Sequence, residues 1–149
     1  MILLDTNVIS EPLRRSPEAR VINWIDAQSL EILYLSAITV AELRFGIASL
    51  PVGKRRDELE NSIENQILPL FTGRVRPFDI NCTTAYAELM AKAKSSGLAI
   101  AAADGYIAAI AATNRFSVAT RDVSPFQAAG VNIINPWEFG SSQEFGGHY

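Results

Sequence analysis

The stretch ILLDTNVIS, residues 2–10, ends a short apolar run with a carboxylate. Ile2–Leu4 have the character of a short buried strand, and the polar residues Asp5, Thr6 and Asn7 follow directly. In folds built on parallel strands, ligands bind beyond the carboxyl ends of the strands. The stretch therefore predicts that Asp5 lies at a sheet edge where a functional site is built.

Segments of strand character alternate with segments of helix character along the rest of the chain. Strands are expected at residues 2–4, 32–36, 75–78, 117–120 and 132–134. The helices between them include an amphipathic one at 81–96 and an alanine-rich one at 104–113, whose small side chains allow close packing. This alternation predicts a layered α/β fold with a mainly parallel sheet. One domain is expected over residues 1–139, followed by a Gly- and Ser-rich mobile tail at 140–149.

The composition argues against several kinds of catalytic site. The 149 residues include one cysteine, Cys82, and one histidine, His148. Catalytic triads, Cys–His dyads and histidine-ligated zinc sites therefore lack their imidazole unless the C-terminal tail folds back. Cys82 is expected to be a small buried hydrophobe. The net charge of −3 argues against a broad basic face for nucleic acid.

No segment has the pattern of a signal peptide or a membrane span. The apolar N-terminal stretch ends at Asp5, which is too early for a signal peptide. The longest apolar run, residues 98–112, is too short to cross a bilayer and is interrupted by Asp104. We therefore expect a soluble, cytoplasmic protein without membrane contact.

Four carboxylates occupy positions that the expected topology brings to one edge of the sheet. Asp5 and Asp122 each follow a strand, Glu42 lies in the first turn of a helix, and Asp104 begins the alanine-rich helix. Each acid taken alone also fits a structural role. Asp5 and Asp104 fit helix caps, Asp122 fits a turn, and Glu42 fits a capping box with Thr39.

A shared location of these acids would be unfavourable unless they were protonated or neutralised by a cation. Two carboxylates about 5 Å apart repel by about 3 kcal/mol at an effective dielectric constant of ~20, and four would repel more. An oxygen-lined pocket without histidine or cysteine suits Mg²⁺ or Mn²⁺. Such an ion lowers the pKa of a bound water and screens an incoming phosphate. The acids therefore indicate hydrolysis of a phosphodiester by water.

Five segments, in this order and spacing, resemble PIN-domain toxins of the VapC type, and among these the FitB-type subgroup. They are LLDTNVIS, ITVAELRFG, GLAIAAADGYIAAIA, ATRDVSPF and GVNIINP. The resemblance extends from Met1 to about Trp137. It implies three layers, with a five-stranded, mainly parallel sheet flanked by helices. It also implies a ribonuclease that depends on Mg²⁺ or Mn²⁺.

The resemblance assigns roles to individual residues of this chain. Its acidic catalytic positions fall on Asp5, Glu42, Asp104 and Asp122, and the metal would be held by Asp5, Asp104 and Asp122. Its small polar positions fall on Asn7 and Thr120, which would orient an acid or a metal-bound water. Arg44 and Arg121 lie nearest the matching segments and are candidates for phosphate contacts or for balancing the acids.

The resemblance also implies partners. Members of this group form homodimers within a larger complex and bind a ribbon-helix-helix antitoxin, which in turn binds operator DNA. The C-terminal segment of the antitoxin would lie in a groove of this chain, and our own hypothesis places that groove between the helices near Trp24 and Leu59. Apolar residues at this helical spacing more commonly form core, so the groove is the less favoured interpretation of these two residues.

Three alternatives can be weighed from the residues. A haloacid-dehalogenase-like phosphatase needs a second acid where Asn7 stands, and a receiver domain needs a lysine after a late strand, which is absent. Both are disfavoured. A third alternative is an interaction module, largely without catalysis, inside a DNA-bound regulatory complex. Retention of all four acids favours the enzyme.

Overall fold

A central sheet of five parallel strands organises the computed structural model, which describes residues 1–140. The strand order is β3-β2-β1-β4-β5, so the N-terminal strand occupies the middle. The strands are β1 (Ile2–Leu4), β2 (Leu33–Ser36), β3 (Val75–Arg76), β4 (Ser117–Ala119) and β5 (Ile133–Ile134). His148 and the expected tail, apart from Gly140, lie outside the described residues.

The central position of β1 determines which loops meet. Ile2 pairs with Leu33 of β2 on one side and with Ser117 of β4 on the other. The N–H of Asp5 donates to the carbonyl of Ala119 at 2.9 Å, one residue beyond the last strand pair. Because all strands run in the same direction, the segments after β1, β2 and β4 lie together at the carboxyl edge.

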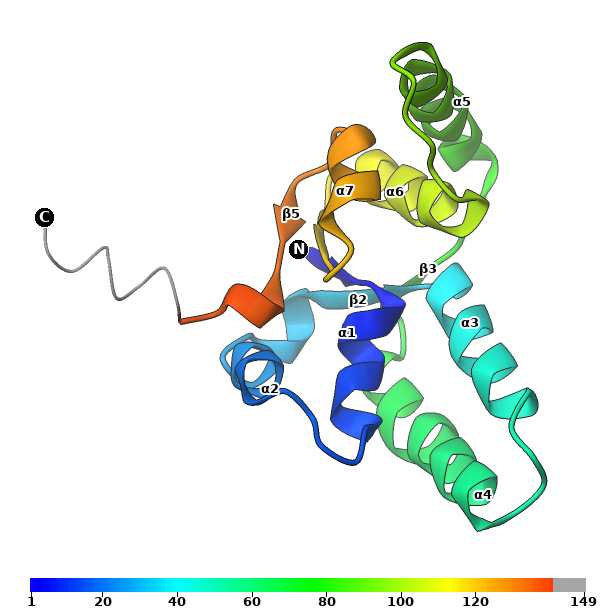
Figure 1. Ribbon diagram of the computed structural model, residues 1–149, viewed down its shortest axis with the longest axis vertical. Coiled ribbons are helices and arrows are strands. Elements are labelled where there is room, and N and C mark those ends of the chain that lie inside the picture. The colour runs from blue at the N-terminus through cyan, green and yellow to red at the C-terminus, as the bar shows by residue number, and fades with distance from the viewer. Residues whose placement is uncertain (141–149) are drawn as a thin grey trace, which may run out of the picture.

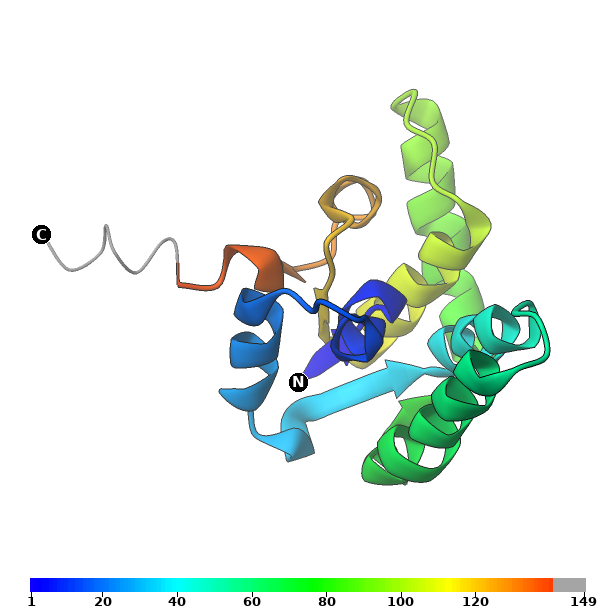
Figure 2. The ribbon, with the colours of Figure 1, turned by 60° about the horizontal axis from the view of Figure 1, so that its bottom comes forward.

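Helices cover both faces of the sheet, which gives the expected three layers (Figures 1 and 2). The long α5 and α6 pack against each other on one face together with α7, whereas α1, α2 and α4 cover the other face, with α3 beside α4 (Figure 1). The α-helices are α1 (Thr6–Ser10), α2 (Ala19–Asp26), α3 (Ala37–Ala48), α4 (Lys54–Asn61), α5 (Ile80–Ser95), α6 (Ala102–Asn114) and α7 (Val123–Ala128). Short 3₁₀ segments lie at Glu11–Leu13, Leu30–Ile32, Leu68–Phe71 and Pro136–Glu138, and α4 continues as a π-helix over Ser62–Ile67.

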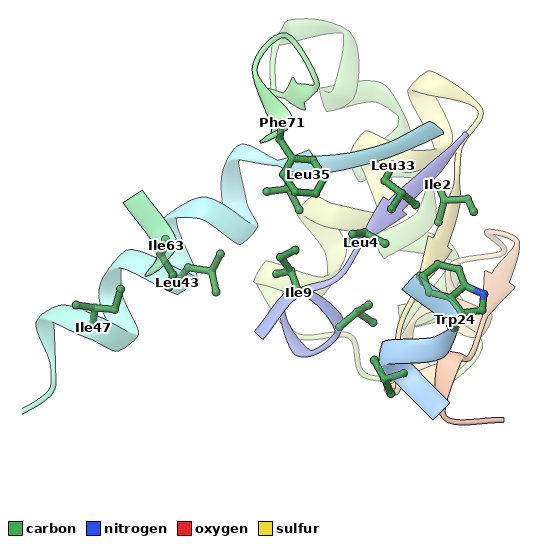
Figure 3. Close-up of a cluster of buried hydrophobic side chains, with 13 residues drawn as sticks. Ile2, Leu4, Ile9, Trp24, Leu33, Leu35, Leu43, Ile47, Ile63 and Phe71 are labelled. Carbon is green, nitrogen blue, oxygen red and sulfur yellow. The ribbon is translucent and has the colours of Figure 1, made fainter. Parts of the chain in front are cut away.

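Alternate side chains of the strands point into two cores. Leu4 and Leu35 are fully buried on one face, where Trp24 of α2 joins them at 5% exposure (Figure 3). Leu3 and Val118 point to the opposite core beneath α5 and α6. Complete burial of one such aliphatic side chain contributes about 1.5–3 kcal/mol, so these strands are held chiefly by their side chains.

The alanine-rich α6 packs as closely as its sequence predicts. Its buried face includes Gly105, where an added Cβ would lie 2.9 Å from Met90 Sδ and 3.1 Å from Tyr86 Cε2. Cys82 of α5 is 1% exposed, which confirms that it is a buried hydrophobe. Within residues 1–140, no helix combines the length and apolar character needed to traverse a membrane.

Some details differ from the sequence-based expectations. Helix α7 was not expected, and it contains Pro125 in its first turn, where a missing N–H breaks no helical hydrogen bond. Trp24 belongs to the core, so the interpretation of Trp24 as a groove residue is wrong. Helix α3 begins at Ala37, because Ser36 Oγ accepts the N–H of Thr39 at 3.0 Å and acts as the cap.

Candidate active site

Asp5 is a buried carboxylate, 4% exposed, at the carboxyl end of the central strand. Its Oδ1 accepts the N–H of Thr6 at 2.8 Å, which caps helix α1. Its Oδ2 accepts the hydroxyl of Thr120 at 2.8 Å, from the segment that follows the neighbouring strand β4. The expectation that Asp5 could cap a helix is therefore confirmed. Capping uses only Oδ1 of its carboxylate and leaves Oδ2 for other contacts.

The surroundings of Asp5 favour its protonated form. Its pKa is raised from 3.8 to about 6, and burial is the largest cause of the rise. The hydrogen bonds from Thr120 and Thr6 oppose the rise in part, whereas the negative charges of Asp104 and Glu42 add to it. A carboxyl group that titrates near neutral pH can be converted to the charged form by a bound cation.

Asp104 shows that the acids interact with one another. Burial raises its pKa above the usual value, and the charges of Asp122 and Glu42 add to the rise. Asp5, Glu42, Asp104 and Asp122 therefore lie near enough for mutual repulsion, although they come from four separate segments. Asp104 lies in the first turn of α6, whose N-cap is Ala101, so it is not a helix cap.

Asn7 lies between the first and last of these acids. Its Nδ2 is 3.5 Å from Asp5 Oδ2, from Thr120 Oγ1 and from Asp122 Oδ2. These contacts are long, so the amide group acts as a weak positive pole among three acceptors rather than as a strong donor to one. The N–H of Asp122 in turn donates to Thr120 Oγ1 at 2.9 Å, which fixes the segment after β4.

Glu42 accepts a hydrogen bond from Thr6, a residue to which the sequence had assigned no role. The hydroxyl of Thr6 donates to Glu42 Oε1 at 2.8 Å, which joins helix α1 to helix α3. A capping box of Glu42 with Thr39 is not formed, because Ser36 is the cap of α3. The available signal for Thr6 was its position between Asp5 and Asn7, which places it at the same sheet edge.

The two candidate phosphate contacts differ in their surroundings. The guanidinium of Arg44 is occupied by Glu64, with contacts of 2.8 Å from Nε and 3.1 Å from Nη2. The guanidinium of Arg121 lies over the ring of Trp137 at 5.3 Å, and its backbone N–H donates to Asn7 Oδ1 at 3.3 Å. The backbone of Arg121 therefore contacts Asn7 beside the acids while its guanidinium lies over Trp137, whereas the guanidinium of Arg44 is paired with Glu64 on the surface.

The donor set fits a hard divalent cation only in part. All the acids offer oxygen, which Mg²⁺ and Mn²⁺ prefer, and their mutual repulsion is the kind that a cation relieves. In residues 1–140, however, no three or more His, Cys, Asp or Glu side chains form a group placed to hold a metal ion. Magnesium commonly binds through one or two carboxylates and retains several waters, so the site fits an ion held in that manner.

A groove of about 360 Å³ opens beside the acids. Thr6 and Glu42 line the groove and also belong to the acidic site, so the two are continuous. Arg14 and Arg55 line it as well, and the Arg55 guanidinium donates to the carbonyl of Leu13 at 3.1 Å. Its apolar lining consists of Leu13, Leu43, Gly46, Ile47, Leu50, Leu59 and Ile63.

Comparison with known proteins reveals relatives over nearly the whole chain. The plasmid stability protein StbB of Pseudomonas syringae pv. tomato is 65% identical over 138 residues, which cover 93% of this chain and 99% of the relative. The VapC ribonuclease Y4jK of Sinorhizobium fredii is 61% identical with the same coverage. Toxin FitB of Neisseria gonorrhoeae is 56% identical over 137 residues, covering 92% of this chain and 99% of FitB.

Solved structures agree with these relatives. The crystal structure of FitAcB from Neisseria gonorrhoeae matches with a TM-score of 0.90 and 55% identity, covering 93% of this chain and 100% of that one. A structure of FitAB bound to an IR36 DNA fragment matches with a TM-score of 0.89, also at 55% identity, covering 92% and 96%. The PIN domain as a family matches residues 2–131. The chain belongs to the PIN-domain family.

Proposed function

We propose that the protein is the toxin of a toxin–antitoxin pair and hydrolyses phosphodiester bonds of RNA with the help of Mg²⁺ or Mn²⁺. The observation that carries this proposal is the buried Asp5, whose pKa is raised to about 6 beside the charges of Asp104 and Glu42. The names of the VapC ribonuclease and of toxin FitB, both more than half identical to this chain, support the substrate and the biological role.

In this proposal the metal ion, when bound, supplies an activated water and screens the phosphate charge. One or two of Asp5, Asp104 and Asp122 would hold it directly, and bound waters would connect it to the remaining acid. Thr120 keeps Asp5 in one orientation through its 2.8 Å hydrogen bond, and Asn7 offers its amide to Asp5 and Asp122.

Two further side chains would act on the substrate. Glu42 Oε1 is held by Thr6, and the carboxylate would accept the proton of the attacking water. The guanidinium of Arg121 would contact the phosphate. Arg44 would have to leave Glu64 before it made such a contact, so we assign the phosphate to Arg121 alone.

The groove beside the acids suits the C-terminal segment of an antitoxin. Its lining is mostly aliphatic and includes Leu59, one of the two residues expected there, while Glu42 lies where a cationic side chain of the segment would be attracted. The solved FitAB complex with DNA supports a partner that connects this chain indirectly to operator DNA. We further propose that the chain forms a homodimer within that complex.

Cleavage of a generic single-stranded RNA by the chain freed of its partner tests the enzymatic proposal. Wild type, Asp5→Asn and the matched control Asp26→Asn, an exposed acid at the end of α2, would be compared with Mn²⁺ and with chelator. Metal-dependent cleavage by wild type and by the control, but not by Asp5→Asn, supports the enzyme. Equal background from all three, with the fold intact, supports a largely non-catalytic module of a regulatory complex instead.

A further inference from the structure

The hydroxyl of Thr6 connects two of the acids. We propose that Thr6 is a positioning residue, which holds one oxygen of Glu42 and so aims the other oxygen at the water that attacks the phosphate. This inference rests on the proposed nuclease function. It assigns a role to a side chain that does not need to touch metal or substrate.

Thr6 donates hydrogen bonds to both Asp5 and Glu42, through different atoms. Its backbone N–H donates to Asp5 Oδ1 at 2.8 Å, and its hydroxyl donates to Glu42 Oε1 at 2.8 Å. Both bonds go to acids of the site, and hydrogen bonds to charged acceptors are stronger than neutral ones. The first residue of α1 therefore fixes the distance between the acid after β1 and the acid on α3.

The buried hydroxyl groups of Ser36 and Thr39 form a hydrogen-bonded chain that ends at the hydroxyl of Thr6. Thr39 is fully buried, and its Oγ1 lies 3.3 Å from Thr6 Oγ1 and 3.2 Å from Ser36 Oγ. Each hydroxyl has one proton, and the charged oxygen of Glu42 is the nearer acceptor for that of Thr6. The proton between the two threonines then belongs to Thr39, and the proton between Ser36 and Thr39 belongs to Ser36. Such a chain of donors strengthens the last bond, to Glu42.

Glu42 needs this support more than Asp5 does. Asp5 is buried and holds its orientation by packing and two hydrogen bonds. Glu42 is exposed, so packing does not select its rotamer. The bond from Thr6 leaves Oε2 with no hydrogen-bond partner among residues 1–140, and this oxygen can accept a proton from water.

Two substitutions at position 6 separate the hydroxyl from the shape of the side chain. Thr6→Val keeps the shape and removes the donor, while Thr6→Ser keeps the donor. We expect Thr6→Val to lower kcat about 10- to 100-fold with little change in KM, and Thr6→Ser to stay within about threefold of wild type. Thr84→Val, an exposed position on α5, is the matched control and should leave kcat unchanged.

A double variant that carries substitutions at both Thr6 and Glu42 tests whether Thr6 affects kcat through Glu42. Glu42→Gln removes the acid, so adding Thr6→Val should cause no further loss of kcat if Thr6 works only on Glu42. The inference is overturned if Thr6→Val keeps full activity, if Thr6→Ser fails to restore it, or if the loss is equal in both backgrounds.

A crystal structure of Thr6→Val gives a readout that does not require catalysis. The Glu42 carboxylate should leave its wild-type position or lose order, whereas Thr6→Ser should retain it. An unmoved Glu42 overturns the inference. If wild type fails to cleave RNA, the nuclease proposal fails, and this pair of structures alone decides whether Thr6 positions Glu42.

Discussion

The hydroxyl of Thr120 donates to the carboxylate of Asp5 at 2.8 Å, and the two side chains are 0% and 4% exposed. The residues follow adjacent parallel strands, β4 and β1, but are 115 positions apart in the sequence. The bond opposes the effect of burial on the pKa of Asp5. The bond therefore keeps the pKa of Asp5 lower than burial would make it in the absence of Thr120.

Removal of this hydroxyl should raise the pKa of Asp5 further, because the hydrogen bond from Thr120 lowers it. Thr120→Val is expected to shift the titration of the Asp5 carboxyl carbon, followed by NMR in metal-free protein, to higher pH. It should also cost about 1.5–3 kcal/mol of unfolding free energy at pH 8, where the acid is charged. Thr120→Ser retains the donor, and an equal shift in that variant would contradict this account.

Stability should fall as pH rises, because the pKa of Asp5 is about 6 in the folded protein against 3.8 for the unfolded chain. A raised folded pKa contributes stability that is fully present below pH 3.8 and is lost as pH rises through about 6. The shift corresponds to about 3 kcal/mol. Asp5→Asn cannot titrate, so its urea midpoint should drop less than that of wild type between pH 4 and 7.5. Parallel curves for the two proteins would refute this.

Asp104→Asn should weaken Mn²⁺ binding while leaving or even raising thermal stability. Burial raises the pKa of Asp104 most, and the charges of Asp122 and Glu42 add to the rise, so a neutral amide removes both penalties at neutral pH. Thermal denaturation without metal should give an equal or higher Tm than wild type, and added Mn²⁺ should raise it less. A large loss of Tm would mean that Asp104 is chiefly structural.

Two glycines on helices should respond in opposite directions to alanine. Gly105→Ala places a Cβ 2.9 Å from Met90 Sδ, and overpacking of this kind costs about 1–3 kcal/mol, more than the ~1 kcal/mol gained in helix propensity. Gly46→Ala on α3 meets no atom within 4 Å and should gain up to about 1 kcal/mol. Urea denaturation measures the free energy of unfolding of both variants. If Gly105→Ala were more stable than wild type, Met90 and Tyr86 of α5 would have to move aside at little cost, which would contradict the prediction.

A charged side chain introduced into the groove should weaken binding of the proposed antitoxin without lowering the rate of RNA cleavage. Under the proposed function, Leu59→Glu places a carboxylate in the aliphatic lining and should weaken association with the proposed antitoxin at least 10-fold, about 1.4 kcal/mol, while RNA cleavage by the free chain persists. Leu70→Glu, at a half-exposed leucine outside the groove, is the matched control.

Hydrogen exchange gives a second test of the groove. The amides of α3 and α4 should gain protection when the antitoxin binds. Equal affinities of the Leu59 and Leu70 variants, together with unchanged exchange, would place the antitoxin elsewhere.

The sheet and its acidic edge followed from local patterns in the sequence. Short apolar runs that end in Asp5 or just before Asp122 mark strands and also mark the edge where they finish. The order of helices and strands allowed the four acids to converge there, although each acid alone also fitted a structural role. Their mutual effects on the pKa values of Asp5 and Asp104 agree with that prediction.

Features that depend on distant partners were not accessible from the sequence. Arg44 is paired with Glu64, twenty positions away, and no local pattern indicates that pair. The link from Thr6 to Glu42 spans 36 positions and exists only once α1 and α3 pack. Helix α7 was missed because Asp122 was interpreted as part of a turn, although the proline that follows at position 125 is compatible with the first turn of a helix.

The position of β4 next to β1 has a consequence for synthesis of the protein. A nascent chain exposes Asp5 and Glu42 early, but it lacks Thr120 and Asp122 until the fourth strand has left the ribosome. Until then, Asp5 has no donor from a neighbouring strand, and the last acid is missing. Under the proposed function, the nuclease site therefore cannot be complete until translation of the domain is nearly finished.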